Sequence, residues 1–187
     1  MPDRAGSEHG RSHVLASVVR LVNTGPEAGE GELLDSVARL RDFIAEAQVT
    51  EVRPPTGADL AALHELRRRL YSVFAASTMA DAVLRVNEIL AAAPIQPRLT
   101  THDGRPPHLH FFPPYATLTD HLAADCAMAL SLLIADGERA RLRICAAEDC
   151  SRVLYDESRN RTRLYCDSQR CGNRLHAAAY RARRRSV

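Results

Sequence analysis

Apolar residues recur at helical spacing through most of the chain before residue 138. Positions three and four residues apart indicate helices over five segments, namely 14–22, 33–44, 56–74, 78–90 and 117–133. A threonine followed three residues later by aspartate opens the last three segments, which is the capping-box pattern of a helix N-terminus. No such periodicity precedes Val14, so we expect residues 1–12 to form a flexible tail.

The pattern changes to strand-like alternation between the fourth and fifth predicted helices. Residues 98–101 and 108–112 flank Asp103-Gly104, a pair that favours a turn with positive φ, so a β-hairpin with a long loop is expected. His108 and His110 fall on the same strand face. Solvent exposure is the default for both. A metal or ligand site is the alternative, with His102 nearby in sequence, but it needs a third ligand and an open position, and no matching acidic motif lies near.

Four cysteines near the C-terminal end form two closely spaced pairs. Cys145 and Cys150 are separated by four residues, as are Cys166 and Cys171, and fifteen residues lie between the pairs. Each pair can supply two thiolates from one tight turn, so the spacing predicts one structural Zn²⁺ bound by four cysteines. Disulfides are the alternative, but no secretory signal peptide is recognisable and the fifth cysteine, Cys126, would stay unpaired in an apolar helix.

The residues around these cysteines resemble the CGNR zinc finger family. The resemblance covers about residues 141–185 and is carried by Arg143-Ile-Cys145, Cys150, Tyr155-Asp156-Glu-Ser158-Arg159-Asn160, Tyr165-Cys166, Cys171-Gly172-Asn173-Arg174 and Tyr180-Arg181-Ala-Arg183. Tyr165 stands where the family usually has tryptophan. The resemblance implies a bacterial transcription regulator linked to stress.

Charge is distributed very unevenly along the chain. Residues 139–187 hold 13 arginines against 5 acidic residues, giving +8, whereas residues 1–138 hold 12 against 18, giving −6. Four thiolates on one zinc dication would leave −2, so the metal-bound finger would still carry about +6. All 25 basic residues are arginine, whose guanidinium group pairs well with phosphate and with guanine edges. This surplus indicates a nucleic-acid partner.

Two groups of arginines are candidates for DNA contact. One group alternates in the loop 158–163 and would form a phosphate rail if that loop is extended. The other lies after Cys171, where residues 172–185 contain no helix breaker beyond Gly172 and predict a helix with an arginine stripe suited to a DNA groove. The predicted DNA contacts are Arg159, Arg161, Arg163, Arg174, Arg181, Arg183, Arg184 and Arg185. For Asn173 and Arg174 a second interpretation stays open, in which Asn173 bonds the finger backbone and Arg174 offsets thiolate charge.

The first predicted helix ends in a motif that resembles a second family. Leu21-Val22-Asn23-Thr24 is similar to the start of the ABATE domain, which usually precedes a CGNR finger. The family typically has an aspartate and an aromatic residue where this chain has Arg20 and Leu21. We expect Asn23 to cap the helix rather than to contact a ligand. Arg67-Arg68-Arg69, in the third predicted helix, point about 100° apart and are expected to be solvated or ion-paired.

The sequence therefore predicts a mostly α protein: a flexible tail (1–12), a helical ABATE-like domain with one hairpin (13–138), and a small α/β zinc finger with a basic C-terminal helix (139–187). The favoured function is a DNA-binding transcription regulator whose N-terminal domain senses a small-molecule effector or forms a homodimer. The alternative is a zinc-stabilised protein–protein adaptor without specific DNA binding. No phosphate loop, nucleophile elbow or open metal motif is present, so an enzyme is not expected. No run reaches the roughly eighteen apolar residues of a membrane helix, and we expect a cytoplasmic location.

Overall fold

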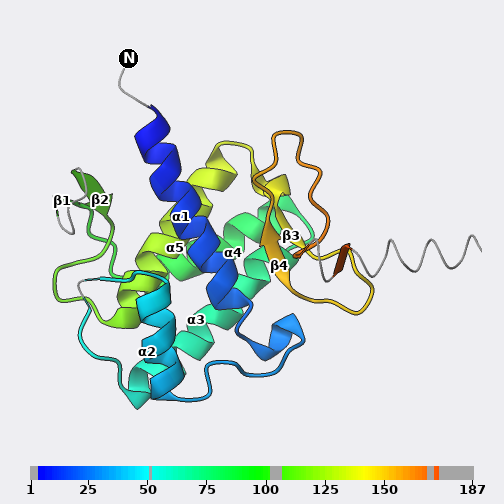
Figure 1. Cartoon of the computed structure of the whole chain (residues 1–187). Coiled ribbons are helices and arrows are strands. Elements are labelled where there is room, and N and C mark those ends of the chain that lie inside the picture. The colour runs from blue at the N-terminus through cyan, green and yellow to red at the C-terminus, as the bar shows by residue number, and fades with distance from the viewer. Residues whose placement is uncertain (1–3, 51, 102–106, 168–170, 173–187) are drawn as a thin grey trace, which may run out of the picture.

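A computed structural model describes residues 4–50, 52–101, 107–167 and 171–172, with side chains described from Ser12 onward. Helices dominate the described residues, and two small antiparallel sheets accompany them (Figure 1). In chain order the elements are α1 (Arg4–Val22), a 3₁₀ turn η1 (Pro26–Ala28), α2 (Val37–Glu46), α3 (Gly57–Ala75), α4 (Met79–Ala92), β1 (Arg98–Thr100), β2 (His108–His110), α5 (Leu118–Ala135), a second 3₁₀ turn η2 (Arg139–Arg141), β3 (Leu142–Ile144) and β4 (Val153–Tyr155). The mostly α fold class predicted from the sequence is confirmed.

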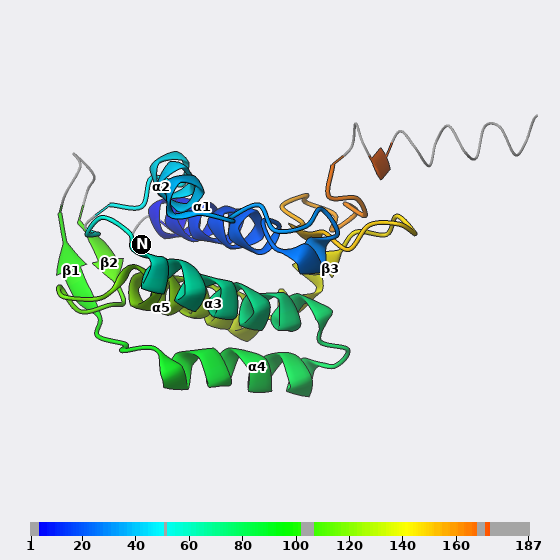
Figure 2. The same cartoon turned by 90° about the horizontal axis from the view of Figure 1, so that it is seen from below.

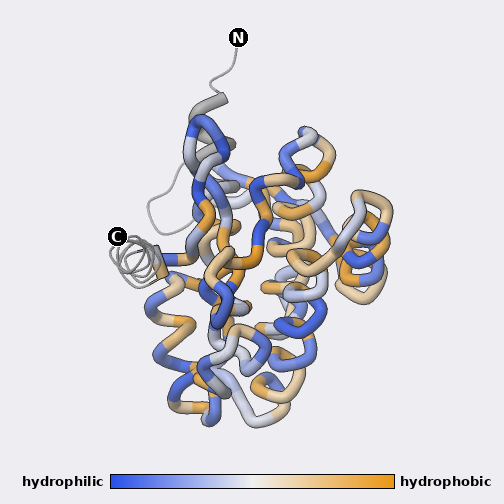
Figure 3. Tube along the Cα trace, turned by 90° about the vertical axis from the view of Figure 1, so that its right-hand side faces the viewer, coloured by the Kyte–Doolittle hydropathy of each residue, from blue (hydrophilic) through white to orange (hydrophobic). Residues whose placement is uncertain are grey.

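The helices pack into a bundle, and α5 lies inside it. α5 contacts α1, α3 and α4, while α2 packs on α3. Seen from below, α1 and α2 lie on one side, α3 and α5 in the middle and α4 on the other side (Figure 2). Hydrophobic and hydrophilic stretches alternate along the helical turns, as the spacing of apolar positions requires (Figure 3). The largest fully buried side chains of this core include Leu15, Leu40, Leu63, Leu70, Ile89, Leu118, Leu130 and Leu133.

Local capping fixes where three of these helices begin. Thr56 and Asp59 form a reciprocal capping box at α3, and Thr117 and Asp120 form another at α5. At α4 the Thr78 side chain accepts a hydrogen bond from the Asp81 N–H. Each cap satisfies backbone N–H groups that have no partner inside the helix, so the threonine–aspartate pattern predicted these starts correctly.

Two expectations about element boundaries were wrong. α1 begins at Arg4, so residues 4–12 are helical rather than a flexible tail, because polar residues can extend a helix whose later turns are already packed. α2 begins at Val37, where the Ser36 side chain caps it, and the buried Leu34 packs into the core from the preceding loop. Near the finger, residues 139–141 form η2, and the strand β3 that precedes Cys145 spans Leu142–Ile144.

α5 also corrects the expectation about membrane helices. Among the described residues it is long and apolar enough to cross a membrane, since its two aspartates leave the average hydropathy high. However, 56% of that helix is buried inside the protein, and three other helices pack against it. These contacts are those of a helix in a protein core.

The β1–β2 hairpin and the β3–β4 hairpin lie at opposite ends of the bundle (Figure 2). β1 pairs antiparallel with β2 in the register Leu99↔Leu109, as the alternation between residues 98 and 112 predicts. His110 is only 7% exposed and His108 is half-buried, so the expectation that both face solvent is wrong. The histidine face of this hairpin packs against α5, where the rings of Phe112 and His121 stack with centroids 3.7 Å apart.

Candidate metal centre

The first cysteine pair lies at the tip of the β3–β4 hairpin. Cys145 directly follows β3, and its N–H donates to the Arg152 carbonyl across the hairpin at 2.8 Å. The Cys150 N–H donates to the Ala147 carbonyl at 3.0 Å, which closes a tight turn between the two cysteines. This turn aims both thiols to the same side, as the four-residue spacing predicts.

A second turn carries the other pair. The N–H groups of Cys171 and Gly172 both donate to the Asp167 carbonyl at 3.1 Å. The Cys166 N–H lies 3.5 Å from the Cys145 sulfur, so the two turns meet directly. Two knuckles from different parts of the chain therefore face one another.

The four sulfurs have the spacing of a tetrahedral metal site. They all lie within 4.8 Å of one another, and the Cys166 Sγ lies 3.7 Å from the Sγ atoms of both Cys150 and Cys171. Four thiolates at about 2.3 Å from a zinc ion would be about 3.8 Å apart. All five cysteines are free thiols, so no disulfide competes for these positions. The donor set and its geometry fit one structural Zn²⁺, with all four coordination positions filled by the chain.

The ionisation of these thiols also shows the need for a cation. Burial and then the neighbouring thiols of Cys171, Cys150 and Cys145 raise the pKa of Cys166. Burial also acts on Cys145, but N–H groups such as that of Ala147 outweigh it and lower its pKa. Ionisation is therefore eased at Cys145, whereas it is opposed at Cys166. A dication removes that opposition, because a coordinating thiol is deprotonated outright.

The finger rests on a small apolar cluster of its own and is anchored on the bundle core. Cys145, Ala147, Leu154 and Cys171 form the separate cluster, whereas Leu142 and Val153 belong to the core of the bundle. β3 and β4 thus place Leu142 and Val153 in the bundle core, and β4 places Leu154 in the finger cluster. The metal centre is therefore held close to α1 and α3.

Asn23 joins α1 to the finger. Its side-chain N–H donates to the Val153 carbonyl at 2.9 Å, and the Val153 N–H donates back to Asn23 Oδ1 at 2.8 Å. Asn23 is 6% exposed, and this pair of bonds satisfies the free edge of β4 as a neighbouring strand would. Asn23 directly follows the last residue of α1, which is the expected capping position. Its side chain, however, bonds β4 and so forms the joint between α1 and the finger.

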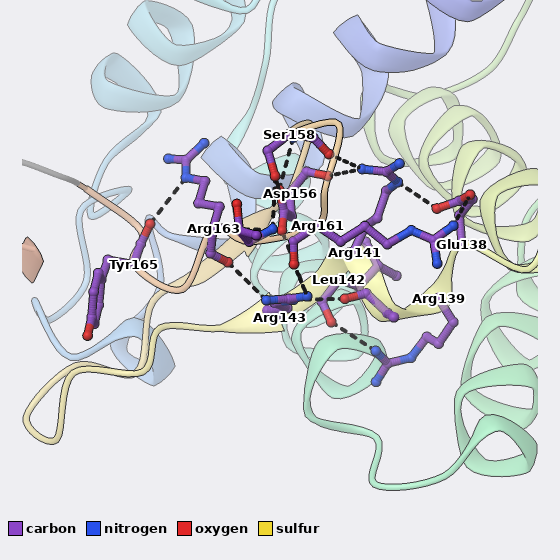
Figure 4. Close-up of polar contacts among 12 residues, drawn as sticks. Glu138, Arg139, Arg141, Leu142, Arg143, Asp156, Ser158, Arg161, Arg163 and Tyr165 are labelled. Atoms are coloured by element: carbon purple, nitrogen blue, oxygen red, sulfur yellow. Dashed lines mark hydrogen bonds and ion pairs between the residues drawn. The ribbon is translucent and has the colours of Figure 1, made fainter.

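Arginines hold the finger loops through backbone carbonyls (Figure 4). Arg141 Nη1 donates to the carbonyls of Asp156 and Ser158 at 2.8 Å, and Arg143 Nη2 donates to that of Arg161 at 2.7 Å. Arg139 Nη2 reaches back to the Ala76 carbonyl at the end of α3, at 2.8 Å. These guanidinium groups therefore have structural roles that the sequence interpretation missed, since their partners are distant carbonyls.

Asp156 is the buried acid at the centre of this network. It is fully buried, and its carboxylate accepts from the Ser158 N–H at 2.9 Å, the Ser158 hydroxyl at 2.6 Å and the Arg163 N–H at 2.9 Å. Burial alone would raise its pKa, but these donors and the charge of Arg143 outweigh burial and lower the pKa below its usual value. The Asp156-x-Ser158 spacing is typical of a turn in which aspartate bonds the backbone two residues ahead, and could have revealed this role.

The predicted phosphate rail is not formed, because its loop is turned rather than extended. Arg161 has a φ of 53° and pairs with Glu138 at 2.6 Å. Arg163 donates to the carbonyls of Tyr165 and Cys166 at 3.1 and 2.7 Å. The Arg159 side chain has no partner among the described residues. The other DNA candidates, and Asn173, lie outside the described residues; they are Arg174, Arg181, Arg183, Arg184 and Arg185.

Family models match both parts of the chain. The ABATE model, whose description is "Putative stress-induced transcription regulator", matches residues 15–137, and the model of the CGNR zinc finger matches residues 141–184. No curated protein matches the chain. The first match covers about two thirds of the 187 residues and contains all of α2 to α5, while the second contains the four cysteines. The chain belongs to the ABATE family of putative stress-induced transcription regulators and carries a CGNR zinc finger.

Proposed function

We propose that this protein is a cytoplasmic transcription regulator that binds DNA through its zinc finger and the arginines that follow it. The observation that carries the proposal is the +8 charge of residues 139–187 against −6 for residues 1–138. Zinc fixes the finger as a rigid platform, and the charge surplus favours a polyanion. The description of the ABATE family as regulators supports the same function.

The arginine network narrows which residues we expect to contact DNA. Arg141 and Arg143 donate to carbonyls within the finger and are half-buried. The proposed contacts are therefore Arg159 together with the C-terminal set Arg174, Arg181, Arg183, Arg184 and Arg185. Arg161 is available as well, because its pair with Glu138 is an exposed ion pair of little net stability that a phosphate could displace.

The helical bundle has a proposed sensing role. A groove of about 760 Å³ lies between α1 and the finger and is lined by residues of both, among them Val19, Arg20, Arg152 and Tyr155, and also by three of the four cysteines of the metal centre. Its volume lies within the range of small-molecule sites, which often occur at domain interfaces. An effector in this groove would touch both parts and so bias how the finger sits on α1.

A salt titration of duplex-DNA binding tests the proposal. Replacing Arg181, Arg184 and Arg185 by alanine is expected to weaken binding and to reduce the slope of log K against log salt by about 2.7, if each arginine neutralises one phosphate. The matched control removes three exposed arginines of the bundle, Arg39, Arg41 and Arg68, and should leave affinity and slope nearly unchanged. A zinc-loaded protein without salt-sensitive DNA binding would instead favour the adaptor, with the arginines as a protein-docking surface.

A further inference from the structure

Histidines gather at the end of the bundle away from the finger. His108 and His110 lie on β2, and their Nε2 atoms are 3.1 Å apart. Their ring centroids are 5.0 Å apart with planes tilted by 56°. His121 of α5 lies beside them, with its centroid 6.0 Å from that of His110. The zinc finger uses none of these three side chains.

The spacing of the first two rings matches that of two imidazoles on one metal ion. Zn–N bonds of about 2.0–2.1 Å at angles between octahedral and tetrahedral values place the two nitrogens roughly 2.9–3.4 Å apart. The same geometry places the ring centroids roughly 5 Å apart. The observed separations fall at these values. A metal ion could therefore replace the proton of the Nε2–Nε2 hydrogen bond without moving β2.

His121 is oriented in the way that metal-binding histidines often are. Its Nε2 lies 3.2 Å from Asp125 Oδ2, so the ring N–H is directed at a carboxylate and the other nitrogen carries the lone pair. That nitrogen, Nδ1, is buried and has no hydrogen-bond partner among the described residues. Phe112 stacks on the His121 ring and fixes its plane, while the Phe111 N–H lies 3.4 Å from Asp125 Oδ1. A buried imidazole lone pair without a donor is unfavourable unless a cation or a proton meets it.

We propose that His108 and His110 bind a divalent transition-metal ion, with His121 as the third imidazole and Asp125 as the carboxylate that orients it. Imidazole ligands select Zn²⁺, Ni²⁺ or Cu²⁺ over Mg²⁺ and Ca²⁺, which prefer oxygen. The chain sets two nitrogens in place, and His121 supplies the third through its Nδ1. The remaining positions take water, so this site binds a metal less tightly than the four cysteines do. The proposal is independent of DNA binding.

The test uses the full chain with zinc in the finger and without a polyhistidine tag, titrated with Ni²⁺. The calorimetric titration is expected to show one further metal equivalent while the zinc content stays at one per chain. Paramagnetic Ni²⁺ should broaden the ring proton resonances of His108 and His110 and leave those of His64 sharp. His64 serves as the control position, because its Nε2 lies 2.8 Å from the Leu34 carbonyl and is already hydrogen-bonded there.

Three variants decide the outcome. His108→Gln is the primary variant because His108 is only half-buried, and it should abolish the second equivalent while the chain stays folded. His121→Gln should weaken Ni²⁺ binding at least tenfold, whereas the control His64→Gln should not change it. Absence of a second equivalent in the unmodified chain, or equal binding by His108→Gln, would overturn the proposal and leave these residues a hydrogen-bonded pair.

Discussion

The helical bundle and the zinc finger differ in what holds their chains together. Leucine, valine and phenylalanine side chains from α1 to α5 form one continuous core in the bundle. The finger has only a small cluster around Leu154 and the cysteines, and its loops are tied by arginines that donate to carbonyls. Apolar burial is not directional, whereas metal bonds and hydrogen bonds fix position. We therefore expect the bundle to tolerate single polar losses better than the finger tolerates loss of a ligand.

The largest expected effect comes from removing one zinc ligand. Cys166→Ser should abolish zinc binding and unfold the finger, because structural zinc sites contribute on the order of 10 kcal/mol to folding of such segments. The helices should remain, with some destabilisation because Leu142 and Val153 leave the bundle core. Zinc content together with hydrogen exchange of the α3 and α5 amides measures both effects. Retention of one zinc per chain would contradict the ligand assignment. Cys126→Ser is the matched control, since Cys126 lies in α5 and outside the metal site.

A buried ion pair tests whether the bundle also depends on a polar contact. Arg67 is 2% exposed, donates to Thr24 Oγ1 at 3.1 Å and forms an ion pair with Glu32 through two hydrogen bonds. Arg67→Ala should lower the free energy of unfolding by about 3 kcal/mol, because Glu32 would lose its ion-pair partner and keep only the Leu34 N–H and the nearby His64 ring. Denaturant unfolding measures the loss.

The neighbouring arginine provides the control for that change. Arg68 is exposed and pairs with Glu65 on the surface of α3, so Arg68→Ala should cost less than about 0.5 kcal/mol. Equal losses for Arg67→Ala and Arg68→Ala would show that the buried pair adds nothing beyond helix propensity. The expectation that Arg67-Arg68-Arg69 would be solvated or ion-paired is confirmed, since all three form ion pairs, but the spacing did not reveal that Arg67 is buried.

The same contrast explains which features the sequence could predict. The starts of α3, α4 and α5 depend on residues three positions apart, and the zinc site depends on two local turns, so both were predictable. Contacts between residues far apart in the sequence could not be predicted. Asn23 bonds Val153, which is 130 residues away, and Arg139 bonds Ala76. The local sequence pattern around Asn23 or Arg139 does not identify the residue that it bonds.

Two misjudged segments show how tertiary packing overrides local pattern. Leu34 fits the apolar period of α2, yet Ser36 starts the helix and leaves Leu34 to fill the core from a loop. His108 and His110 alternate as exposed strand residues do, but the hairpin lays that face on α5. In both cases the periodicity showed which residues share a face, and only the fold determined what covers that face.

The joint between the two regions should show an intermediate effect. Asn23→Ala removes both bonds to Val153 and leaves a buried backbone N–H and carbonyl without partners, which should cost about 2–4 kcal/mol. Hydrogen exchange should localise the loss to β4 and the finger. Asn87→Ala, on the exposed face of α4, is the control and should stay within about 0.5 kcal/mol of the unmodified protein. A uniform loss of protection over all helices would mean that the bundle and finger unfold as one unit.

The smallest expected effect, and the one with a pH signature, lies at the start of α3. Burial would raise the pKa of Asp59, but hydrogen bonds from Thr56 and the charge of Arg53 outweigh it and hold the pKa below its usual value. Because the pKa is lower in the folded state, Asp59 stabilises the fold above its unfolded value of about 3.9, and this contribution disappears as the pH falls through the folded pKa.

Asp59→Asn should therefore cost about 1–2 kcal/mol at neutral pH and progressively less towards acid, so that the two stability curves converge below about pH 4. Asp120→Asn removes the corresponding capping residue of α5, which has no arginine hydrogen-bonded to it among the described residues, and should give a smaller loss. Zinc release at acid pH affects all variants alike and cancels in the difference. The difference in the free energy of unfolding between the unmodified protein and Asp59→Asn could instead stay constant from neutral to acid pH. That result would show that shape and helix propensity, rather than the charge of Asp59, stabilise this end of the bundle.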